Sequence, residues 1–277
     1  GTMELPNKSF LGYQQCRWSY KNKDHLMKVA KRMYRENIPC DVFYLDIDYM
    51  ENYKVFTVDS KDFKEFSKMV DKLHEMGYKL VTIIDPGIKK ENGYFVYDEC
   101  IKNNYYLKDK DGKPYIGEVW PGDSIFPDFT RKNVRDWWGN LHQRLLDLGV
   151  DGIWNDMNEI ADFSTKSKTV PVDTYHIDDN GKKRLQKEVH NIYGHLESKS
   201  TYNALKTYTA TRPFVLTRSA FSGTQKYAAL WTGDNASIWE HLENAVPMMI
   251  NLSLSGYNFI GADMGGFLED ANGELLT

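Results

Sequence analysis

The chain alternates short apolar runs with longer segments of helical periodicity. Seven runs consist mostly of apolar residues, carry polar or charged residues near their ends, and are predicted strands: 10–18, 40–48, 79–87, 149–156, 213–219, 228–234 and 257–263. Continuous apolar runs separated by helical segments are typical of parallel strands that are buried on both faces. The pattern therefore predicts an α/β fold built on a parallel sheet.

Four segments between these runs carry apolar residues at helical spacing. They are predicted amphipathic helices, with these apolar positions: Leu26, Ala30, Met33 and Tyr34; Phe63, Phe66, Met69, Val70 and Leu73; Val134, Trp138, Leu141 and Leu145; Trp239, Leu242, Val246 and Met249. Gly77 and Gly149 follow the second and third of them, where a glycine commonly ends a helix. Each helix is expected to turn its apolar face toward the sheet.

Charged residues gather at the ends of the predicted strands. The ends carry Arg17, Asp46 with Asp48, Asp85, Asp156, Arg218, Asp234 and Asp263. A barrel brings the C-terminal ends of all its strands around one site, whereas a doubly wound sheet offers one crevice. We therefore predict a (β/α)8 TIM barrel in which seven strands are identifiable and the eighth is missing.

The domain organisation follows from this count. Seven strands do not close an eight-stranded barrel, and the sequence stops at "GELLT" where a helix would begin. We expect residues 4–277 to form a partial catalytic barrel, truncated before its end. Two polar segments, at about 88–128 and 161–190, exceed a minimal barrel unit and are predicted loop insertions on the active face.

Composition excludes several classes of protein. The formal net charge is −4 with Lys and Arg spread throughout, which leaves no basic patch for nucleic acid. There is no apolar stretch long enough to span a membrane. Three scattered cysteines support neither a disulfide framework nor a zinc site. We expect a soluble protein, with the cytoplasm favoured; the oligomeric state is not indicated.

Two carboxylates carry the candidate chemistry. Asp156 and Asp234 end the fourth and sixth predicted strands, and glycoside hydrolysis needs such a pair, one to attack or stabilise the sugar and one to protonate the leaving oxygen. The alternative is that each aspartate caps a helix. Trp154 and Trp231 precede them and Arg218 ends the intervening strand, which together favour a sugar site.

The chain resembles the catalytic barrel of glycoside hydrolase family 31, the α-glucosidase family. The resemblance covers nearly all of residues 10–277 and is carried by seven ordered stretches: "CRWSY" (16–20), "YLDIDYM" (44–50), "IDPGI" (84–88), "GEVWPGDSIFPDFT" (117–130), "GIWNDMNE" (152–159), "LTRSAFSGTQKYAALWTGDN" (216–235) and "GADMGGF" (261–267). One such stretch alone would be a weak signal, but seven in order are specific.

The resemblance implies a role for each matching residue. Asp156 matches the nucleophile, Asp234 the general acid/base, Asp46 an aspartate that binds sugar hydroxyls, and Arg218 the arginine beside the acid/base. Residues implied to line or support the sugar site are Trp18, Trp120, Trp154, Met157, Trp231, Asp263 and Phe267. The family retains anomeric configuration through a covalent glycosyl-enzyme intermediate. Asp156 then has to be ionised and Asp234 protonated when the reaction starts.

The resemblance therefore predicts a retaining, exo-acting α-glucosidase that releases terminal glucose from malto- or isomalto-oligosaccharides. It implies no cofactor and no metal; Asp46 and Asp48 alone do not supply the six or so oxygen ligands of a hard cation. The seven histidines are interpreted as structural or surface residues. Asn158 and Glu159 are interpreted as supporting residues that orient the pair or cap a helix.

Some features depart from the family pattern. Ile160 stands where a proline is common. Against that pattern, we expect a histidine of the sugar site to lie beyond residue 277, and we expect these 277 residues to lack the N-terminal β-sandwich and the C-terminal β-domains. We expect the isolated fragment to be weakly active or inactive. Alternatives are an α-transglucosidase or another α-glycosidase of the family, a non-catalytic carbohydrate-binding barrel, and a phosphate-binding barrel enzyme. Asp263 in "GADMGGF" disfavours the last, because it would repel phosphate.

Overall fold

The centre of the computed structural model, which describes residues 4–277, is a seven-stranded sheet in which all neighbouring strands are parallel. Its strands follow one another in sequence order: β1 (Gln14–Gln15), β2 (Val42–Leu45), β3 (Lys79–Ile84), β7 (Gly152–Asn155), β10 (Val215–Thr217), β11 (Ala229–Trp231) and β12 (Ile260–Gly261). Each strand lies within one of the seven apolar runs, so the strand prediction is confirmed.

The strand order identifies the architecture. Parallel strands that follow one another in sequence order are the arrangement of a (β/α)8 barrel. In a doubly wound sheet the strands are also parallel, but their order reverses partway across the sheet. Residues from β7, β10, β11 and β12 line one cavity on the inner face. Within residues 4–277, β1 and β12 form the two edges and no further strand joins them. The predicted partial barrel is therefore confirmed.

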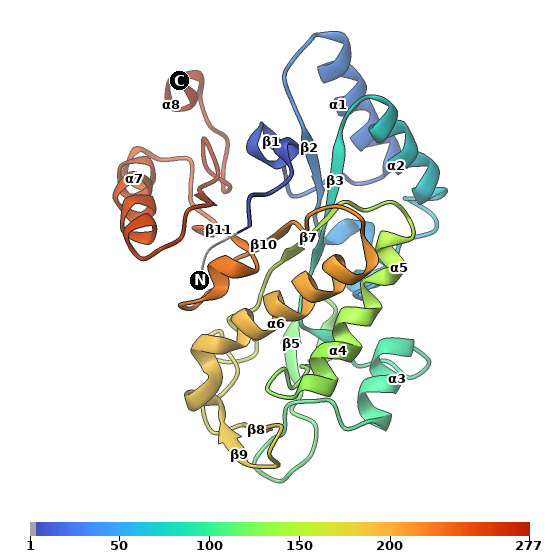
Figure 1. The fold of residues 1–277 in the computed structure, drawn as a ribbon, viewed down its shortest axis with the longest axis vertical. Helices are drawn as coiled ribbons and strands as arrows, with labels where there is room; N and C mark the ends of the chain where they lie inside the picture. The colour runs from blue at the N-terminus through green and yellow to red at the C-terminus, as the bar shows by residue number, and fades with distance from the viewer. Residues whose placement is uncertain (1–3) are drawn as a thin grey trace.

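Helices connect the strands and cover the outer face. They are α1 (Lys23–Arg35), α2 (Phe66–Glu75), α4 (Lys132–Leu141), α5 (Gln143–Leu146), α6 (Gln186–Tyr208), α7 (Trp239–Leu254) and α8 (Gly273–Leu276), with 3₁₀ turns η1 (Lys8–Leu11), η2 (Ile47–Tyr49), η3 (Glu51–Tyr53) and η4 (Thr224–Lys226). Figure 1 shows α1 and α2 side by side near β2 and β3, with α7 on the opposite side beyond β11. Gly77 and Gly149 have φ of 88° and 95°, so both terminate helices as predicted.

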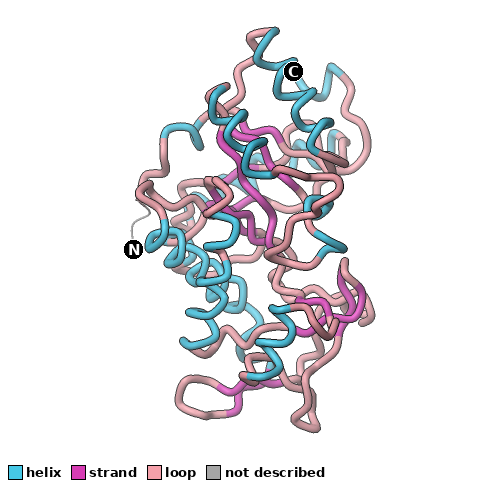
Figure 2. The backbone as a smooth tube through the Cα atoms, turned by 90° about the vertical axis from the view of Figure 1, so that its right-hand side faces the viewer, coloured by secondary structure: helices cyan, strands magenta, loops and turns pink. Residues whose placement is uncertain are grey.

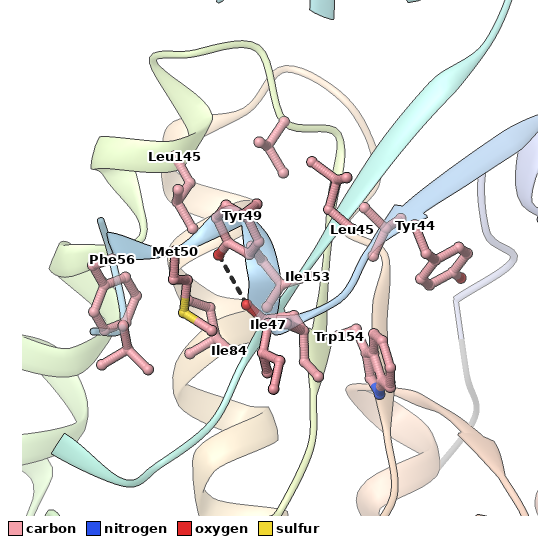
Figure 3. Close-up of a cluster of buried hydrophobic side chains, with 14 of the residues drawn as sticks. Tyr44, Leu45, Ile47, Tyr49, Met50, Phe56, Ile84, Leu145, Ile153 and Trp154 are labelled. Carbon is pink, nitrogen blue, oxygen red and sulfur yellow. Dashed lines mark hydrogen bonds between the residues drawn. The ribbon is translucent and has the colours of Figure 1, made fainter. Parts of the chain in front are cut away.

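The core lies between the sheet and these helices. All four residues of β2 are buried, and side chains from β2 and the turn after it pack with Leu145, Ile84 and Ile153 (Figure 3). The hydroxyl of Tyr49 donates a hydrogen bond to the carbonyl oxygen of Ile83 at 2.9 Å, which ties that turn to β3. The end of β2, where Asp46 lies, is therefore fixed relative to the neighbouring strand.

Both predicted insertions are present, but they are folded segments rather than plain loops. The first contains a small antiparallel sheet and a helix: β4 (Ile88–Lys89), α3 (Phe95–Lys102), β5 (Gly117–Val119) and β6 (Gly122–Ile125). The second contains a hairpin, β8 (Tyr175–Ile177) and β9 (Lys183–Leu185). Figure 2 shows these strands apart from the large sheet. Buried Val119 and Ile125 stabilise the first insertion. Its composition is polar on average and therefore did not indicate a folded segment.

A buried histidine joins the two insertions to α6. The Nδ1 atom of His176 lies 2.9 Å from Asp128 Oδ1, and its Nε2 atom lies 2.7 Å from Gln186 Oε1. The backbone N–H of Ile177 donates to the other oxygen of Asp128 at 2.8 Å. For His176 the structural interpretation is therefore confirmed.

Two predictions about helix faces are wrong. Tyr34, assigned to the apolar face of α1, is 60% exposed because it lies at the last turn, away from the sheet. Trp239, Leu242 and Val246 on α7 are also exposed, and Ala245 is the one buried residue of that helix. Within residues 4–277 little of the chain packs on α7, so its apolar residues have no core to join.

Other sequence-level observations concern cysteines and membranes. Cys16, Cys40 and Cys100 are free thiols in the described part of the chain. Across residues 4–277 the structure contains no helix with the length and apolar character needed to cross a bilayer.

Helix α6 packs very closely on the ends of two neighbouring strands. A Cβ atom added at Gly194 would lie 2.8 Å from the carbonyl oxygen of Ser219 and 3.0 Å from that of Asn158. Both contacts are with backbone, which moves only if the helix or the strand ends move. Glycine at this position therefore sets the distance between α6 and the ends of β7 and β10.

We expect Gly194→Ala to lower the free energy of unfolding by about 1–3 kcal/mol, because the new methyl group overpacks a backbone contact. Gly273→Ala is the matched control, since a Cβ there meets no atom within 4 Å; it should change the value by less than about 0.5 kcal/mol. Denaturant unfolding of the complete protein measures both. Equal effects of the two substitutions would contradict the tight packing of α6.

Candidate active site

The turn after β7 presents the first candidate carboxylate. Asp156 directly follows β7, and Met157 and Ile160 in the turn have φ of 56° and 61°. Proline, with φ fixed near −65°, could not adopt the conformation of Ile160, so the departure from the family pattern suits this turn. No helix starts at Asp156, and the N-cap of α7 is Ile238 rather than Asp234. The helix-cap alternative is therefore wrong for both aspartates.

Arg218 joins the carboxylates of the site. It follows β10, and its Nη1 atom lies 2.9 Å from Asp156 Oδ1 and 3.9 Å from Asp234 Oδ2. Its Nε and Nη2 atoms bind the two oxygens of Glu159 at 2.8 and 3.0 Å. Nη2 also donates to the sulfur of Met157 at 3.2 Å. One guanidinium group thus pairs with Asp156 and Glu159, contacts the turn between them, and lies within ion-pair distance of Asp234.

The separation of Asp156 and Asp234 follows from these contacts. Asp156 Oδ1 and Asp234 Oδ2 both lie near Arg218 Nη1. The distance between these two oxygens therefore cannot exceed the sum of their distances to that nitrogen. That limit on the two oxygens is compatible with the roughly 5–5.5 Å separation of the carboxyl groups in retaining glycosidases. The side chain of Asp156 is 11% exposed and that of Asp234 is 44% exposed. The two carboxyl groups therefore differ in their access to water.

Three further carboxyl groups lie near this pair. Burial raises the pKa of Asp46 to about 7, and the charge of Asp156 adds to the rise. Burial, with Asp156 and Asp46 nearby, raises the pKa of Asp85 well above its ordinary value, and one oxygen of Asp85 has no hydrogen-bond partner among the described residues. Burial and Asp234 raise the pKa of Asp263 to about 6. The site is thus crowded with acids that resist ionisation.

The ionisation of Asp156 differs from the expectation. Burial raises its pKa to about 7, while the Arg218 guanidinium favours the ionised form. Desolvation is the larger influence, so the carboxylate is not as readily ionised near neutral pH as its predicted role suggests.

A cavity of about 260 Å³ adjoins two of these carboxyl groups. Trp154, Trp231 and Phe267 line it, together with Asp234 and Asp263. The rings of Trp154 and Trp231 meet edge to face with centroids 5.5 Å apart. Aromatic surfaces beside carboxylates are suited to binding a sugar ring, because they offer flat apolar area and nearby polar groups.

The structure places Trp18 and Trp120 away from this cavity. The two residues are 54% and 40% exposed, and their ring centroids lie 5.9 Å apart. Trp120 also packs against Phe163 at 5.0 Å. The predicted residues thus form two groups, with Asp46, Asp156, Met157, Arg218, Asp234, Trp154, Trp231, Asp263 and Phe267 around the carboxylates and the cavity, and Trp18 with Trp120 in an outer aromatic group.

Sequence reasoning left some residues of the site without a role. Asp85 was noted only as a strand end, and Glu159 only as a supporting residue, although it makes both of its contacts with Arg218. Glu197 on α6 was not noticed at all, yet it is fully buried and the charges of Asp85, Asp156 and Glu159 act on it. Its signal was available: an acidic residue in the apolar stripe of a helix.

Across residues 4–277, no group of three or more His, Cys, Asp or Glu side chains is arranged to hold a metal ion. Asp48, considered beside Asp46 as a cation ligand, instead accepts hydrogen bonds from Lys21 Nζ at 2.6 Å and Ser19 Oγ at 2.9 Å.

Comparison with known proteins finds relatives along the whole chain. The family model "Glycosyl hydrolases family 31 TIM-barrel domain" matches residues 3–277. The curated "Alpha-glucosidase 2" of Bacillus thermoamyloliquefaciens is 48% identical over 278 residues, which are 100% of this chain and 35% of that protein. The chain thus spans about a third of the length of that relative.

Solved structures agree in fold. A glucosidase II alpha subunit with alpha3-Glc2 bound superposes with a TM-score of 0.93 at 39% identity, covering 100% of this chain and 30% of that one. A Flavobacterium johnsoniae GH31 dextranase mutant complexed with isomaltotriose has a TM-score of 0.88 at 30% identity, covering 96% of this chain and 33% of that one.

We expect Asp46→Asn to stabilise the protein more at pH 8 than at pH 5. Below about pH 4 the raised pKa of Asp46 costs no stability. As pH rises from there to about 7, stability falls, because the carboxyl group ionises in the unfolded chain but not in the folded one. Asparagine keeps an acceptor for the N–H of Ile47, which donates to Asp46 at 2.7 Å. The gain at pH 8 should exceed that at pH 5 by at least about 1 kcal/mol.

Asp48→Asn is the matched control. Although partial burial raises the pKa of Asp48, its contacts with Lys21 and Ser19 lower it overall, so Asp48 is ionised at both pH values. Its replacement should destabilise the protein by a similar amount at each. Thermal unfolding at pH 5 and pH 8 measures the stability of the wild type and of the two variants. A gain in stability for Asp46→Asn that is the same at both pH values would contradict the raised pKa of Asp46.

Proposed function

The chain belongs to glycosyl hydrolase family 31, and from this membership we propose that the protein carrying it is a retaining, exo-acting α-glucosidase. The observation that carries the proposal is the pair Asp156 and Asp234, held by one arginine beside an aromatic cavity. A relative of which this chain covers a third is named an α-glucosidase, and two structural neighbours have alpha3-Glc2 and isomaltotriose bound, respectively. These names support α-linked glucose as the substrate class.

In the proposed reaction Asp156 is the nucleophile. Its carboxylate forms a bond to the anomeric carbon as the glycosidic bond breaks, and Asp234 donates its proton to the departing oxygen. Water then attacks the same carbon, gives its proton to Asp234, and releases Asp156 as a carboxylate. The greater exposure of Asp234 supports this division, because the group that handles protons has to meet both the leaving group and water.

Arg218 and Asp46 have supporting roles in this proposal. Arg218 at 2.9 Å stabilises the ionised form of Asp156 against the cost of burial. Asp46, buried at the end of β2, offers oxygen atoms to the hydroxyl groups of the bound sugar, as the family resemblance implies. The cavity walls Trp154 and Trp231 pack against the sugar ring.

We expect Asp156→Ala to lower kcat/KM by at least about 10³-fold on every α-glucoside, because no other group replaces the nucleophile. Asp234→Ala should lose a similar factor on maltose and isomaltose but much less on a nitrophenyl α-glucoside, whose leaving group needs little protonation. Initial-rate assays of the complete protein measure both, with exposed Asp136→Asn as control.

A wild-type rate in Asp156→Ala or in Asp234→Ala would show that the substituted residue does not have the role proposed for it. Products identify the alternatives: longer oligosaccharides from maltose would show an α-transglucosidase, and sugar binding without turnover by the wild type would show a carbohydrate-binding barrel.

The pH profile should depend on Arg218. Protonation of Asp156 removes the nucleophile, so kcat/KM should fall as pH decreases through about 7, the raised pKa of Asp156. Arg218→Met removes the charge that opposes this rise, so the acidic limb should move to higher pH, whereas Arg218→Lys should move it less. Rates on the nitrophenyl α-glucoside between pH 5 and pH 9 measure the limb. A limb that stays in place in Arg218→Met would contradict the coupling of the two groups.

A further inference from the structure

Glu197 is a buried acid behind the candidate active site. It lies on the buried stripe of α6, which consists of Val189, Tyr193, Glu197, Thr201 and Leu205. Its side chain is fully buried, and neither carboxyl oxygen reaches hydrogen-bond geometry with any described residue. A carboxyl group in this position costs stability unless it remains neutral or interacts with a polar neighbour. An acid buried at this cost is a candidate for a specific task.

The polar neighbour of Glu197 is Asn158. Asn158 acts to lower the pKa of the Glu197 carboxyl group, although neither Glu197 oxygen is in hydrogen-bond geometry with it. Gly194, one turn earlier on α6, brings the helix against the carbonyl oxygens of Asn158 and Ser219. Glu197 thus lies directly behind the turn that follows Asp156.

Asn158 in turn holds the strand end that carries Arg218. Its Nδ2 atom donates to Thr217 Oγ1 at 2.9 Å, and its Oδ1 atom accepts from the backbone N–H of Ser219 at 2.9 Å. These two contacts flank Arg218 on both sides. One hydrogen of the Asn158 amide remains after the bond to Thr217, and this is the donor available to Glu197.

We propose that Glu197 is a positioning residue of the active site, which fixes Asn158 and, through it, the segment that carries Arg218. The inference rests on the proposed function, because its readout is turnover. Glu197 makes no hydrogen bond with Asp156 or Asp234. It acts by limiting the positions that Asn158, and therefore the Arg218 backbone, can take.

Glu197 does this as an uncharged acid. Burial raises its pKa well above the ordinary value, and the facing carboxyl groups of Asp85, Asp156 and Glu159 add to the rise. Tyr193, its neighbour on α6, is a neutral phenol that donates to the carbonyl oxygen of Pro127 at 2.9 Å. The nearby cation, Arg218, already binds Asp156 and Glu159. Adding another buried negative charge here would weaken the ionisation of Asp156.

Three variants of the complete protein test the proposal. Glu197→Gln keeps a neutral polar group of the same shape and should keep kcat within about threefold of wild type. Glu197→Met keeps the length but leaves Asn158 without its polar neighbour, so kcat should fall by about tenfold or more with little change in KM, because misplaced catalytic groups slow the chemical step. Thr201→Val is the matched control, a buried polar residue one turn later that faces His142 instead of Asn158; it should keep wild-type kcat.

A double-mutant cycle shows whether the effect passes through Asn158. In an Asn158→Ala background, Glu197→Met should cost less than about threefold, since the residue it acts on is gone. The full tenfold loss in that background would overturn the proposal. So would wild-type kcat in Glu197→Met accompanied by a drop in thermal stability like that of Thr201→Val, because Glu197 would then only fill space.

The pH profile of Glu197→Gln is an independent test that holds even where the methionine variant does not fold. Replacing a neutral acid by a neutral amide should leave the acidic limb of kcat/KM in place; a shift of the limb to lower pH would show that Glu197 is ionised and would overturn its assignment. Absence of α-glucoside hydrolysis by the wild type would instead reject the proposed function. An active wild type with a fully active Glu197→Met rejects only the inference about Glu197.

Discussion

The guanidinium group of Arg218 is the interaction on which the site depends. It binds Asp156 and Glu159 at hydrogen-bond distance and reaches Asp234, while Asp46 and Asp85 lie close enough to influence the same charges. Like charges gathered in a region of low dielectric repel one another strongly, and each buried carboxylate also loses its hydration. A single well-oriented cation cannot neutralise all of these groups. The arrangement therefore works only if some of the acids hold protons, and the pKa values of Asp46 and Asp85 are raised accordingly.

The parallel sheet explains why the acids meet at all. Asp46, Asp85, Asp156, Arg218 and Asp234 come from five strands spread over most of the chain, but all lie just beyond strand ends that point the same way. Sequence order around the sheet places β3, β7, β10 and β11 next to one another. A charge at the end of one strand then lies within reach of the charge at the end of the next. The cost of gathering them is met by the apolar contacts of the strands and helices behind them.

Strand ends were also what made the fold and much of the site predictable from sequence. The apolar runs marked the seven strands, and polar residues at their ends marked Asp156, Arg218 and Asp234 before any contact was known. The outer position of Trp18 and Trp120 could not be predicted, because it depends on the path of the first insertion, whose fold rests on a few buried residues such as Val119 and Ile125. The exposed face of α7 could not be predicted either, since periodicity shows that a helix has an apolar face but not what covers it.

Glu197 is a second case in which helical periodicity does not show what packs against a helix face. Helical periodicity places it on the buried face of α6, where an acid contradicts the local rule, and such contradictions are expected at functional sites. The sequence does not show what lies opposite that face, because the contact with Asn158 requires α6 to approach within the distance that Gly194 permits. A helix held farther away would leave room for water beside the carboxyl group and would favour its ionisation. The close packing at Gly194 and the uncharged state of Glu197 therefore belong together. The distance between α6 and the strand ends determines whether Glu197 adds a negative charge near Asp156.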